Sequence, residues 1–324
     1  MLPFKLVCGR NYYLPIGQNV YPVSKYRLTC EYILSRGIAG PDDFVVPDCA
    51  TDADILLVHT PEYLHKLCTG GLSEEEELQL EVPFYPELVQ AYRLCAGGTI
   101  LASEYALRDG IAFNMAGGFH HAFADHGEGF NLINDVAVAI RRLQKDGKIK
   151  TAMTVDCDVH HGNGTAAIFG TGEAPAFSRP GAAPYFRESP PTDVFTISLH
   201  QENNYPAWKP RSSIDVGLPD RIGDEDYLKW LEKALIWGLQ RFHPDLICYL
   251  AGSDPYEGDL LGGLALSIEG LKRRDEFVLR TALQRKIPVL VLPAGGYAVN
   301  VRDTVIIHSN TVVAAGEVFH RSKA

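Results

Sequence analysis

Short, uninterrupted apolar runs recur along the 324-residue chain, separated by longer stretches in which apolar residues have helical spacing. A strand with one face in water alternates polar and apolar residues, whereas a continuous apolar strand is typical of a parallel sheet covered on both faces. The predicted strands are Ile55–His59, Ile111–Met115, Ala152–Val159, Val194–His200, Asp245–Ala251 and Pro288–Pro293. The pattern predicts an α/β fold with a central, mostly parallel sheet and helices on both faces.

Three helices have recognisable limits in the sequence. An acidic run at 224–226, which favours a helix N-terminus, precedes leucines at helical spacing, and Pro244 stops that helix. A second helix is expected over 132–143, with its end at Asp146-Gly147, and Ser267 can cap a third. The alternation of these helices with the predicted strands indicates a sheet built from parallel crossovers.

Composition and charge exclude several classes of protein. The chain is 46% hydrophobic and has no linker rich in Gly, Ser or Pro, so we expect one domain spanning 1–324. Its formal net charge of −10 argues against direct nucleic-acid binding, and its longest apolar runs are too short to cross a membrane. Seven cysteines without a C-x-x-C pair, and a start that lacks a basic region before an apolar one, favour a reduced, cytoplasmic protein. These features leave the oligomeric state open.

Polar residues and glycines cluster directly after four of the predicted strands. The four segments are Ala116–His121, Asp156–Gly164, Ala251–Pro255 and Pro293–Tyr297. In open α/β sheets, ligands bind outside the carboxyl ends of the strands. We therefore expect these segments to contribute to one site.

The second of these segments has the spacing of a metal site. Asp156, Asp158 and His160 alternate, so an extended backbone can direct all three side chains to one face. A single Asp or His at a strand end is more often a cap, but burying so many ionisable groups without a cation would cost several kcal/mol. With Asp254 from another strand end, one imidazole and two carboxylates would hold a cation and leave positions open for water and substrate, as in catalytic zinc sites.

The four segments together resemble the active-site signature of the zinc-dependent histone deacetylase family, which has the arginase–deacetylase fold. The resemblance extends from about Tyr12 to Asn300 and includes the stretches at 129–135 and 196–200. The stretch at 257–264 and the following Lys272–Asp275 are most similar to class IV histone deacetylases and their bacterial relatives.

The resemblance implies a role for each matching residue. The implied zinc ligands are Asp158, His160 and Asp254, and the implied catalytic residues are His120, His121 and Tyr297. The implied potassium or supporting residues are Asp156, Asn163, Ser198 and Leu199, with Asp158 and His160 also contributing to the potassium ion. The residues expected along the substrate tunnel are Gly129, Phe130, Tyr205 and Gly295.

Asn163 departs from the pattern of many family members, which have a second carboxylate for the catalytic pair at this position, although class II and class IV relatives look similar to this chain. An amide oxygen can accept a hydrogen bond from His121, but it carries no charge to raise the imidazole pKa. We expect His121 to be less basic than in a site with a carboxylate partner.

These assignments describe hydrolysis of an amide. The metal polarises the acyl oxygen and lowers the pKa of its water toward ~7, and His121 takes the water proton and later returns one to the leaving amine. His120, held by Asp156, stays mainly electrostatic, and the Tyr297 hydroxyl hydrogen-bonds the developing oxyanion. The expected function is removal of an acetyl or longer acyl group from lysine side chains or related acylated amines. Zinc is the expected metal, Fe²⁺ or Co²⁺ could use the same ligands, and hydroxamates should bind by chelation.

Two segments are expected around the pocket entrance. Residues 201–210 contain the aromatic candidates Tyr205 and Trp208, for which packing on a neighbouring loop is an equal alternative. The segment Asn11–Tyr26 is rich in Tyr, Pro and Gly, which predicts a loop at the pocket rim. The glycines before Tyr297 are consistent either with a hinge or with an ordinary turn.

Two other functions remain to be weighed. A binuclear manganese ureohydrolase would need another Asp soon after His160 and a second Asp near Asp254. In this chain residues 161–164 include no acidic residue, and Asp254 is followed by Pro255 and Tyr256. A protein that binds acyl-lysine without turnover would be signalled by the loss of a catalytic residue or metal ligand, and none is missing. The choice between a protein lysine and a polyamine, and the length of the acyl chain, which could extend to myristoyl, stay open.

Overall fold

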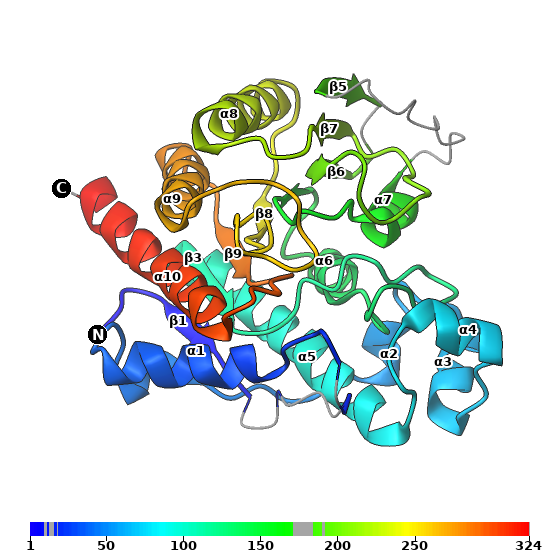
Figure 1. The fold of residues 1–324 in the computed structure, drawn as a ribbon. Helices are drawn as coiled ribbons and strands as arrows, with labels where there is room; N and C mark the ends of the chain where they lie inside the picture. The colour runs from blue at the N-terminus through cyan, green and yellow to red at the C-terminus, as the bar shows by residue number, and fades with distance from the viewer. Residues whose placement is uncertain (10–11, 13–15, 18, 171–183, 190–191, 324) are drawn as a thin grey trace.

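The computed structural model describes residues 1–9, 12, 16–17, 19–170, 184–189 and 192–323. Within these residues a nine-stranded sheet forms the centre of the molecule, in the order β2-β1-β3-β9-β8-β4-β6-β7-β5 (Figure 1). The strands are β1 (Lys5–Val7), β2 (Phe44–Val45), β3 (Ile111–Asn114), β4 (Ala152–Asp156), β5 (Tyr185–Glu188), β6 (Val194–Gln201), β7 (Ile214–Leu218), β8 (Leu246–Leu250) and β9 (Val289–Leu292). All neighbouring pairs are parallel except β5 and β7, so the predicted mostly parallel sheet is confirmed.

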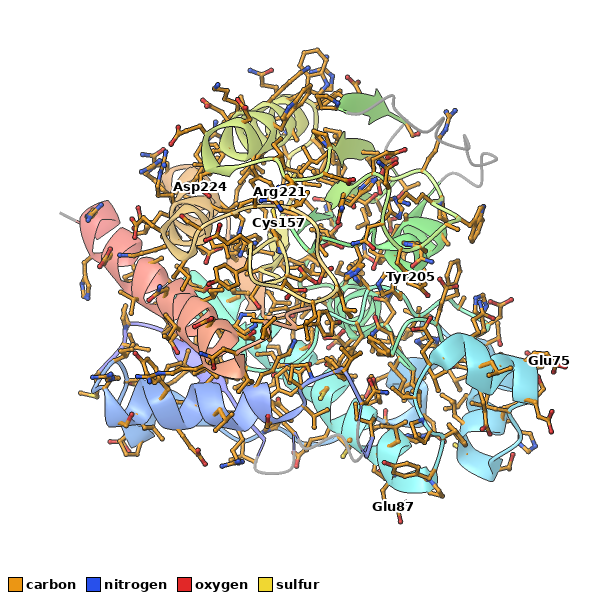
Figure 2. All side chains as sticks on the ribbon, in the orientation of Figure 1. Glu75, Glu87, Cys157, Tyr205, Arg221 and Asp224 are labelled. Atoms are coloured by element: carbon orange, nitrogen blue, oxygen red, sulfur yellow. The ribbon has the colours of Figure 1, made fainter. Side chains whose placement is uncertain are left out.

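Helices cover both faces of this sheet (Figure 1). The helices are α1 (Ser24–Ser35), α2 (Asp52–Ile55), α3 (Pro61–Thr69), α4 (Glu74–Leu80), α5 (Pro86–Asp109), α6 (Asp135–Lys145), α7 (Asn163–Phe169), α8 (Asp224–Arg241), α9 (Ile268–Gln284) and α10 (Val301–Lys323), with a short 3₁₀ helix at Pro41–Asp43. Helices α1, α8, α9 and α10 pack on one face and α5, α6 and α7 on the other. Side chains fill the space between the helices and the sheet (Figure 2). None of the helices in the described parts of the chain is long and apolar enough to span a bilayer.

Strand β9 shows why the central strands read as continuous apolar runs. Val289 and Val291 enter the core beneath α9 and α10, whereas Leu290 and Leu292 enter the opposite core beneath α5 and α6. Since successive side chains of a strand point to opposite faces, a strand covered on both faces must be apolar at every position. The predicted strands that correspond to β3, β4, β6, β8 and β9 are confirmed.

The predicted strand at Ile55–His59 is wrong, because α2 ends at Ile55 and a turn follows it. Thr51 caps that helix by accepting from the backbone of Asp54, whose carboxylate in turn accepts from the backbone of Thr51. This reciprocal capping box favours a helix start, and it outweighs the apolar character of the residues that follow.

The predicted helices at 132–143, 224–243 and after Ser267 correspond to α6, α8 and α9. Ser267 caps α9 as expected, since its hydroxyl accepts from the Gly270 backbone at 2.9 Å. Helix α6 starts later than predicted because Asn134 is its cap, with the side-chain oxygen 3.0 Å from the Ala137 nitrogen.

The four polar segments leave the carboxyl ends of β3, β9, β8 and β4, which are consecutive neighbours in the sheet. Segments that are far apart in the sequence therefore meet at one edge. The described part of 11–26 before α1 forms a loop, while residues 11, 13–15 and 18 lie outside the described residues.

Candidate active site and metal centre

Asp158, His160 and Asp254 lie together where β4 and β8 end, and all three are buried. One potential ligand atom of each lies within 4.8 Å of the others. The Nδ1 atom of His160 is 3.0 Å from Asp158 Oδ1 and 3.4 Å from Asp254 Oδ2. The structure thus brings together the three residues that the sequence suggested as metal ligands.

Backbone groups orient the two carboxylates and leave one oxygen without a donor. The Gly295 nitrogen donates to Asp158 Oδ2 at 2.7 Å, and the Val159 nitrogen donates to Asp254 Oδ1 at 2.9 Å. Asp254 Oδ2 is buried and receives no hydrogen bond from the described residues. A Cβ atom at Gly295 would lie 2.0 Å from that oxygen and 2.5 Å from Asp158 Oδ2, so only glycine leaves room for the carboxylates here.

The electrostatics of this cluster favour a bound cation. Burial alone would lower the pKa of His160, but Asp158 and Asp254 raise it to about 10. Burial and the Asp158 charge raise the pKa of Asp254 to about 7. Two neighbouring buried carboxylates therefore favour positive charge beside them, and the mixed N/O donor set with a free carboxylate oxygen fits a divalent cation.

His120 and His121 occupy opposite electrostatic environments beside the cluster. His120 Nδ1 is 2.7 Å from Asp156 Oδ2, His121 Nδ1 is 2.7 Å from Asn163 Oδ1, and the two Nε2 atoms are 3.1 Å apart. Burial opposes the charge of His120, but Asp156 and Asp158 raise its pKa to about 9. Burial, then the charges of His120 and His160, lower the pKa of His121 well below its ordinary value, and the hydrogen bond with Asn163 only partly opposes them.

A cavity of about 260 Å³ opens onto these groups. It is lined by Val20, Glu81, His121, Gly129, Phe130, His160, Asn204, Tyr205, Leu261 and Tyr297. Gly129, Phe130 and Tyr205, which were expected along the tunnel, thus line this cavity. Val20, from the segment expected at the pocket rim, lines it as well. Gly295, expected along the tunnel, does not line this cavity and lies instead against the carboxylates of Asp158 and Asp254. Trp208 stacks on Phe123 at 5.5 Å between ring centroids, which matches the alternative of packing on a neighbouring loop.

Tyr297 lies at the cavity wall with its ring 6.2 Å from that of His160. Burial, then the charges of Asp158 and Asp254, raise its pKa well above the ordinary value, so the phenol stays a hydrogen-bond donor. The fully buried Lys25 places its Nζ atom 5.4 Å from the Tyr297 ring centroid and donates to the Ala294 oxygen at 2.8 Å. Sequence reasoning missed Lys25, because nothing in its local sequence separates a buried lysine from a surface one.

Three of the residues suggested for a potassium ion, Asp156, Ser198 and Leu199, are on the neighbouring strands β4 and β6. Asp156 and Ser198 are paired in register across β4 and β6, so their side chains are on one face. The side chain of Leu199 is in the core on the other face, so this residue could offer the ion only its backbone oxygen.

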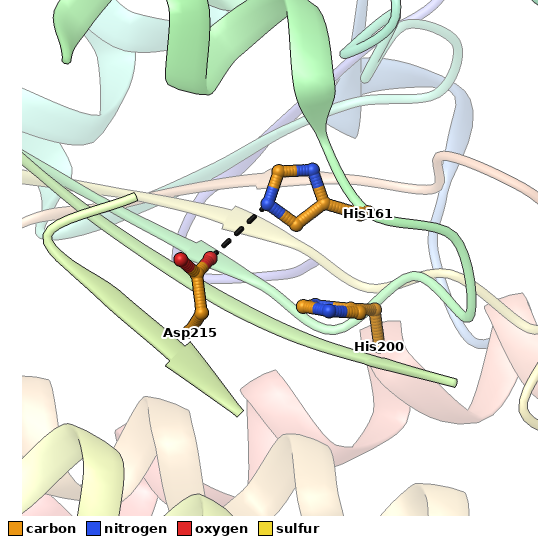
Figure 3. Close-up of side chains that lie close together, drawn as sticks. All are labelled: His161, His200 and Asp215. Atoms are coloured by element: carbon orange, nitrogen blue, oxygen red, sulfur yellow. Dashed lines mark hydrogen bonds and ion pairs between the residues drawn. The ribbon is translucent and has the colours of Figure 1, made fainter. Parts of the chain in front are cut away.

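His161, His200 and Asp215 form a second buried cluster whose potential ligand atoms also lie within 4.8 Å of one another (Figure 3). His161 Nε2 is 3.1 Å from Asp215 Oδ1, whose other oxygen accepts from the Ser212 backbone at 3.1 Å. His200 Nδ1 is 3.1 Å from the hydroxyl of Ser198. Since protein groups engage each of these side chains, we interpret the cluster as a hydrogen-bonded support for the loop that carries His160.

Arg274 on α9 supports the site from outside the cavity, and the sequence indicated it only as part of the Lys272–Asp275 stretch. Its side chain is fully buried, and Nη1 donates to the Gly252 oxygen at 2.6 Å and the Cys157 oxygen at 3.4 Å. Its Nε donates to Asp275 at 2.9 Å. One guanidinium therefore connects the loop that carries Asp158 and His160 with the loop that carries Asp254.

Known proteins with similar sequences share one domain. The histone deacetylase domain family matches residues 21–312. An uncharacterized protein of a Picosynechococcus strain is 38% identical over 317 residues, 98% of this chain and 99% of the relative. Histone deacetylase 2 of Arabidopsis thaliana is 32% identical, over 85% of this chain and 68% of its own length. Histone deacetylase 8 of Xenopus laevis is 31% identical, over 78% of this chain and 77% of its own length.

Solved structures show the same fold at lower identity. The HD domain of HDA15 has a TM-score of 0.76 at 23% identity and covers 97% of this chain and 90% of that chain. An HDAC homolog from Aquifex aeolicus has a TM-score of 0.74 at 24% identity, and the match covers 97% of this chain and 83% of that chain. The chain has the arginase–deacetylase fold and belongs to the histone deacetylase family.

Proposed function

We propose that the protein is a zinc-dependent amidohydrolase that removes an acetyl or longer acyl group from lysine side chains or related acylated amines, with residues 1–324 acting as one catalytic domain. The observation that carries this proposal is convergence on one cavity. His160 of the buried Asp158–His160–Asp254 cluster, His121 and Tyr297 all line the same cavity of about 260 Å³.

Asp158, His160 and Asp254 would hold the metal, which when bound supplies Lewis-acid polarisation of the acyl oxygen and acidification of water. His121 accepts the proton of the attacking water through Nε2, because Asn163 occupies its Nδ1, and it then donates a proton to the departing amine. His120, with its raised pKa, keeps positive charge beside the developing negative charge. The Tyr297 hydroxyl donates to the oxyanion, a contact worth about 2.7–4 kcal/mol at comparable sites.

The cavity wall suits an aliphatic amide substrate. Phe130, Tyr205 and Leu261 offer apolar surface to a methylene chain, and His121 and His160 line the same cavity. Zinc is the proposed metal, with Fe²⁺ or Co²⁺ as alternatives for the same ligands. Asp156, Ser198 and the Leu199 backbone are proposed to hold a structural potassium ion.

The test measures acyl release by the zinc-loaded protein from one lysine peptide that carries acetyl to myristoyl groups, and from acylated polyamines. His121→Ala and Tyr297→Phe should each lower kcat by at least about 100-fold with zinc content unchanged. Tyr105→Phe, on α5 and outside the cavity, is the matched control. A hydroxamate should inhibit by competition with substrate. No release from any of these amides by the zinc-loaded protein would refute hydrolysis and leave a binding protein.

A further inference from the structure

The hydrogen bonds of His121 continue past Asn163 to a carboxylate. The Nδ2 atom of Asn163 donates to Glu128 Oε1 at 2.6 Å, while Asn163 Oδ1 lies 2.7 Å from His121 Nδ1. Asn163 is fully buried, and the side chain of Glu128 is 12% exposed. The catalytic pair therefore does have a second carboxylate, displaced outward by one side chain.

This arrangement determines which end of the amide faces His121. Only the Nδ2 end of Asn163 can face a carboxylate favourably, because its two protons are donors and the carboxylate only accepts. The Oδ1 end must then face His121, so the imidazole carries its proton on Nδ1 and has the lone pair on Nε2. With the amide reversed, Nδ2 would face His121 Nδ1, and Nε2 would lose the lone pair that accepts the water proton.

Three further groups hold the Glu128 carboxylate in place. The Tyr205 hydroxyl donates to the same Oε1 atom at 3.0 Å, Gln79 donates to Oε2 at 3.0 Å, and His126 Nε2 is 3.8 Å from Oε2. The Tyr205 ring stands edge-to-face against the His121 ring, with centroids 5.1 Å apart, and lines the cavity. One carboxylate oxygen thus joins the partner of the base to the wall of the substrate cavity.

We propose that Glu128 is a positioning residue that orients the Asn163 amide, keeps His121 in the tautomer with the proton on Nδ1, and fixes Tyr205 in the cavity wall. The inference rests on the proposed hydrolase function for its kinetic consequences, but the tautomer of His121 is a property of the protein alone. Glu128 touches neither the metal ligands nor the reacting atoms.

The kinetic test compares two substitutions of Glu128 that differ in one property. Glu128→Ala removes the acceptor for Asn163 and should lower kcat about 10–100-fold, the usual range for such supporting partners, with KM changed less than about threefold. Glu128→Gln keeps a carbonyl acceptor and should retain at least about a third of kcat. Glu87→Gln is the matched control, because this exposed carboxylate at the start of α5 lies outside the cavity wall and the contacts of Glu128, and should leave kcat unchanged. Equal kcat for Glu128→Ala and the native protein would overturn the proposal.

A double variant separates positioning from general support of the fold. Asn163→Asp alone would place two carboxylates at the 2.6 Å contact and should lower kcat. Adding Glu128→Gln supplies an amide donor at that contact, so the double variant should be several-fold more active than Asn163→Asp. A structural role alone would make the double variant no better than the single one, and that result would contradict the proposal.

The tautomer is read directly from two-bond ¹H–¹⁵N spectra of the zinc-loaded protein with ¹⁵N-labelled histidine, assigned with His121→Ala. The native protein and Glu87→Gln should show His121 protonated on Nδ1, and Glu128→Ala should show a mixture of tautomers. If the protein hydrolyses none of the amides, the proposed function fails while this spectrum still decides the role of Glu128. An unchanged His121 spectrum in Glu128→Ala would refute that role whatever the activity.

Discussion

Replacing Arg274 with methionine tests how far the loops that carry Asp158 and Asp254 depend on one buried cation. Methionine retains much of the aliphatic volume but none of the donors that reach Gly252, Cys157 and Asp275. Tyr249 would still donate to the Asp275 carboxylate at 2.5 Å. The charge of Asp275, however, would lose Arg274 as its counter-ion in a fully buried site.

The magnitude follows from which partner remains. Removing one member of a buried ion pair costs about 3–5 kcal/mol, because the other charge stays buried without compensation. Arg273 is the matched control, since it is adjacent in sequence but 43% exposed in its pair with Glu225, and Arg273→Met should cost less than about 1 kcal/mol. In Arg274→Met/Asp275→Asn the uncompensated charge is gone, so more than half of the lost stability should return.

Equilibrium urea unfolding of the metal-free proteins, followed by tryptophan fluorescence, measures these free energies, and zinc titration measures the effect on the loops. Arg274→Met should bind zinc at least about tenfold more weakly than Arg273→Met. Two results would refute the reasoning: equal unfolding free energies for the two single variants, or a double variant no more stable than Arg274→Met.

Three further outcomes are expected. Zinc content measured by mass spectrometry should be one ion per chain, lost in Asp254→Asn and retained in Asp215→Asn; two ions, with one lost in Asp215→Asn, would mean that the second cluster binds metal. Gly295→Ala should abolish zinc binding, because its Cβ would lie 2.0 Å from Asp254 Oδ2. Gly147→Ala, which has open space around it, should retain the metal, and both variants should unfold more easily in urea. Burial lowers the pKa of Lys25 from 10.5 to about 8, so the unfolded chain binds more protons between these values. The unfolding free energy of the metal-free protein should therefore rise with pH from 8 to 10.5 by about 3 kcal/mol more than that of Lys25→Met, and a pH-independent difference would contradict this.

The centre of the sheet could be predicted from the sequence, but its edges could not. Strand β9 is apolar at each position because helices cover both its faces, and that leaves a continuous signal. At one edge, β2 has two residues and β1 has three, too few for any periodicity. Near the other edge, β7 contains Asp215, which serves the second histidine cluster and interrupts the apolar run.

The same division applies to the site. Asp158, His160 and the His120-His121 pair follow strands and belong to short motifs, so local sequence was sufficient to suggest them. Glu128 could not be recognised in this way, because its significance is a contact with Asn163, 35 residues further along the chain. A glutamate in a glycine-containing loop is ordinarily solvated, and only the fold shows that this one is directed inward.

The buried cations around the Asp158–His160–Asp254 cluster make hydrogen bonds to its loops and not to the two carboxylates themselves. Lys25 donates to the Ala294 backbone oxygen, and Arg274 donates to backbone oxygens of the two loops that carry Asp158 and Asp254. Neither the ammonium nor the guanidinium makes a hydrogen bond to Asp158 or Asp254 among the described residues, so the loops are fixed while histidines, His160 and more distantly His120, are the cationic side chains that pair with these carboxylates. A site that had recruited either cation to Asp254 Oδ2 would be just as buried and better paired, but it would have no need of a metal. The placement of these two cations therefore accounts for a centre that is both rigid and attractive to a divalent ion.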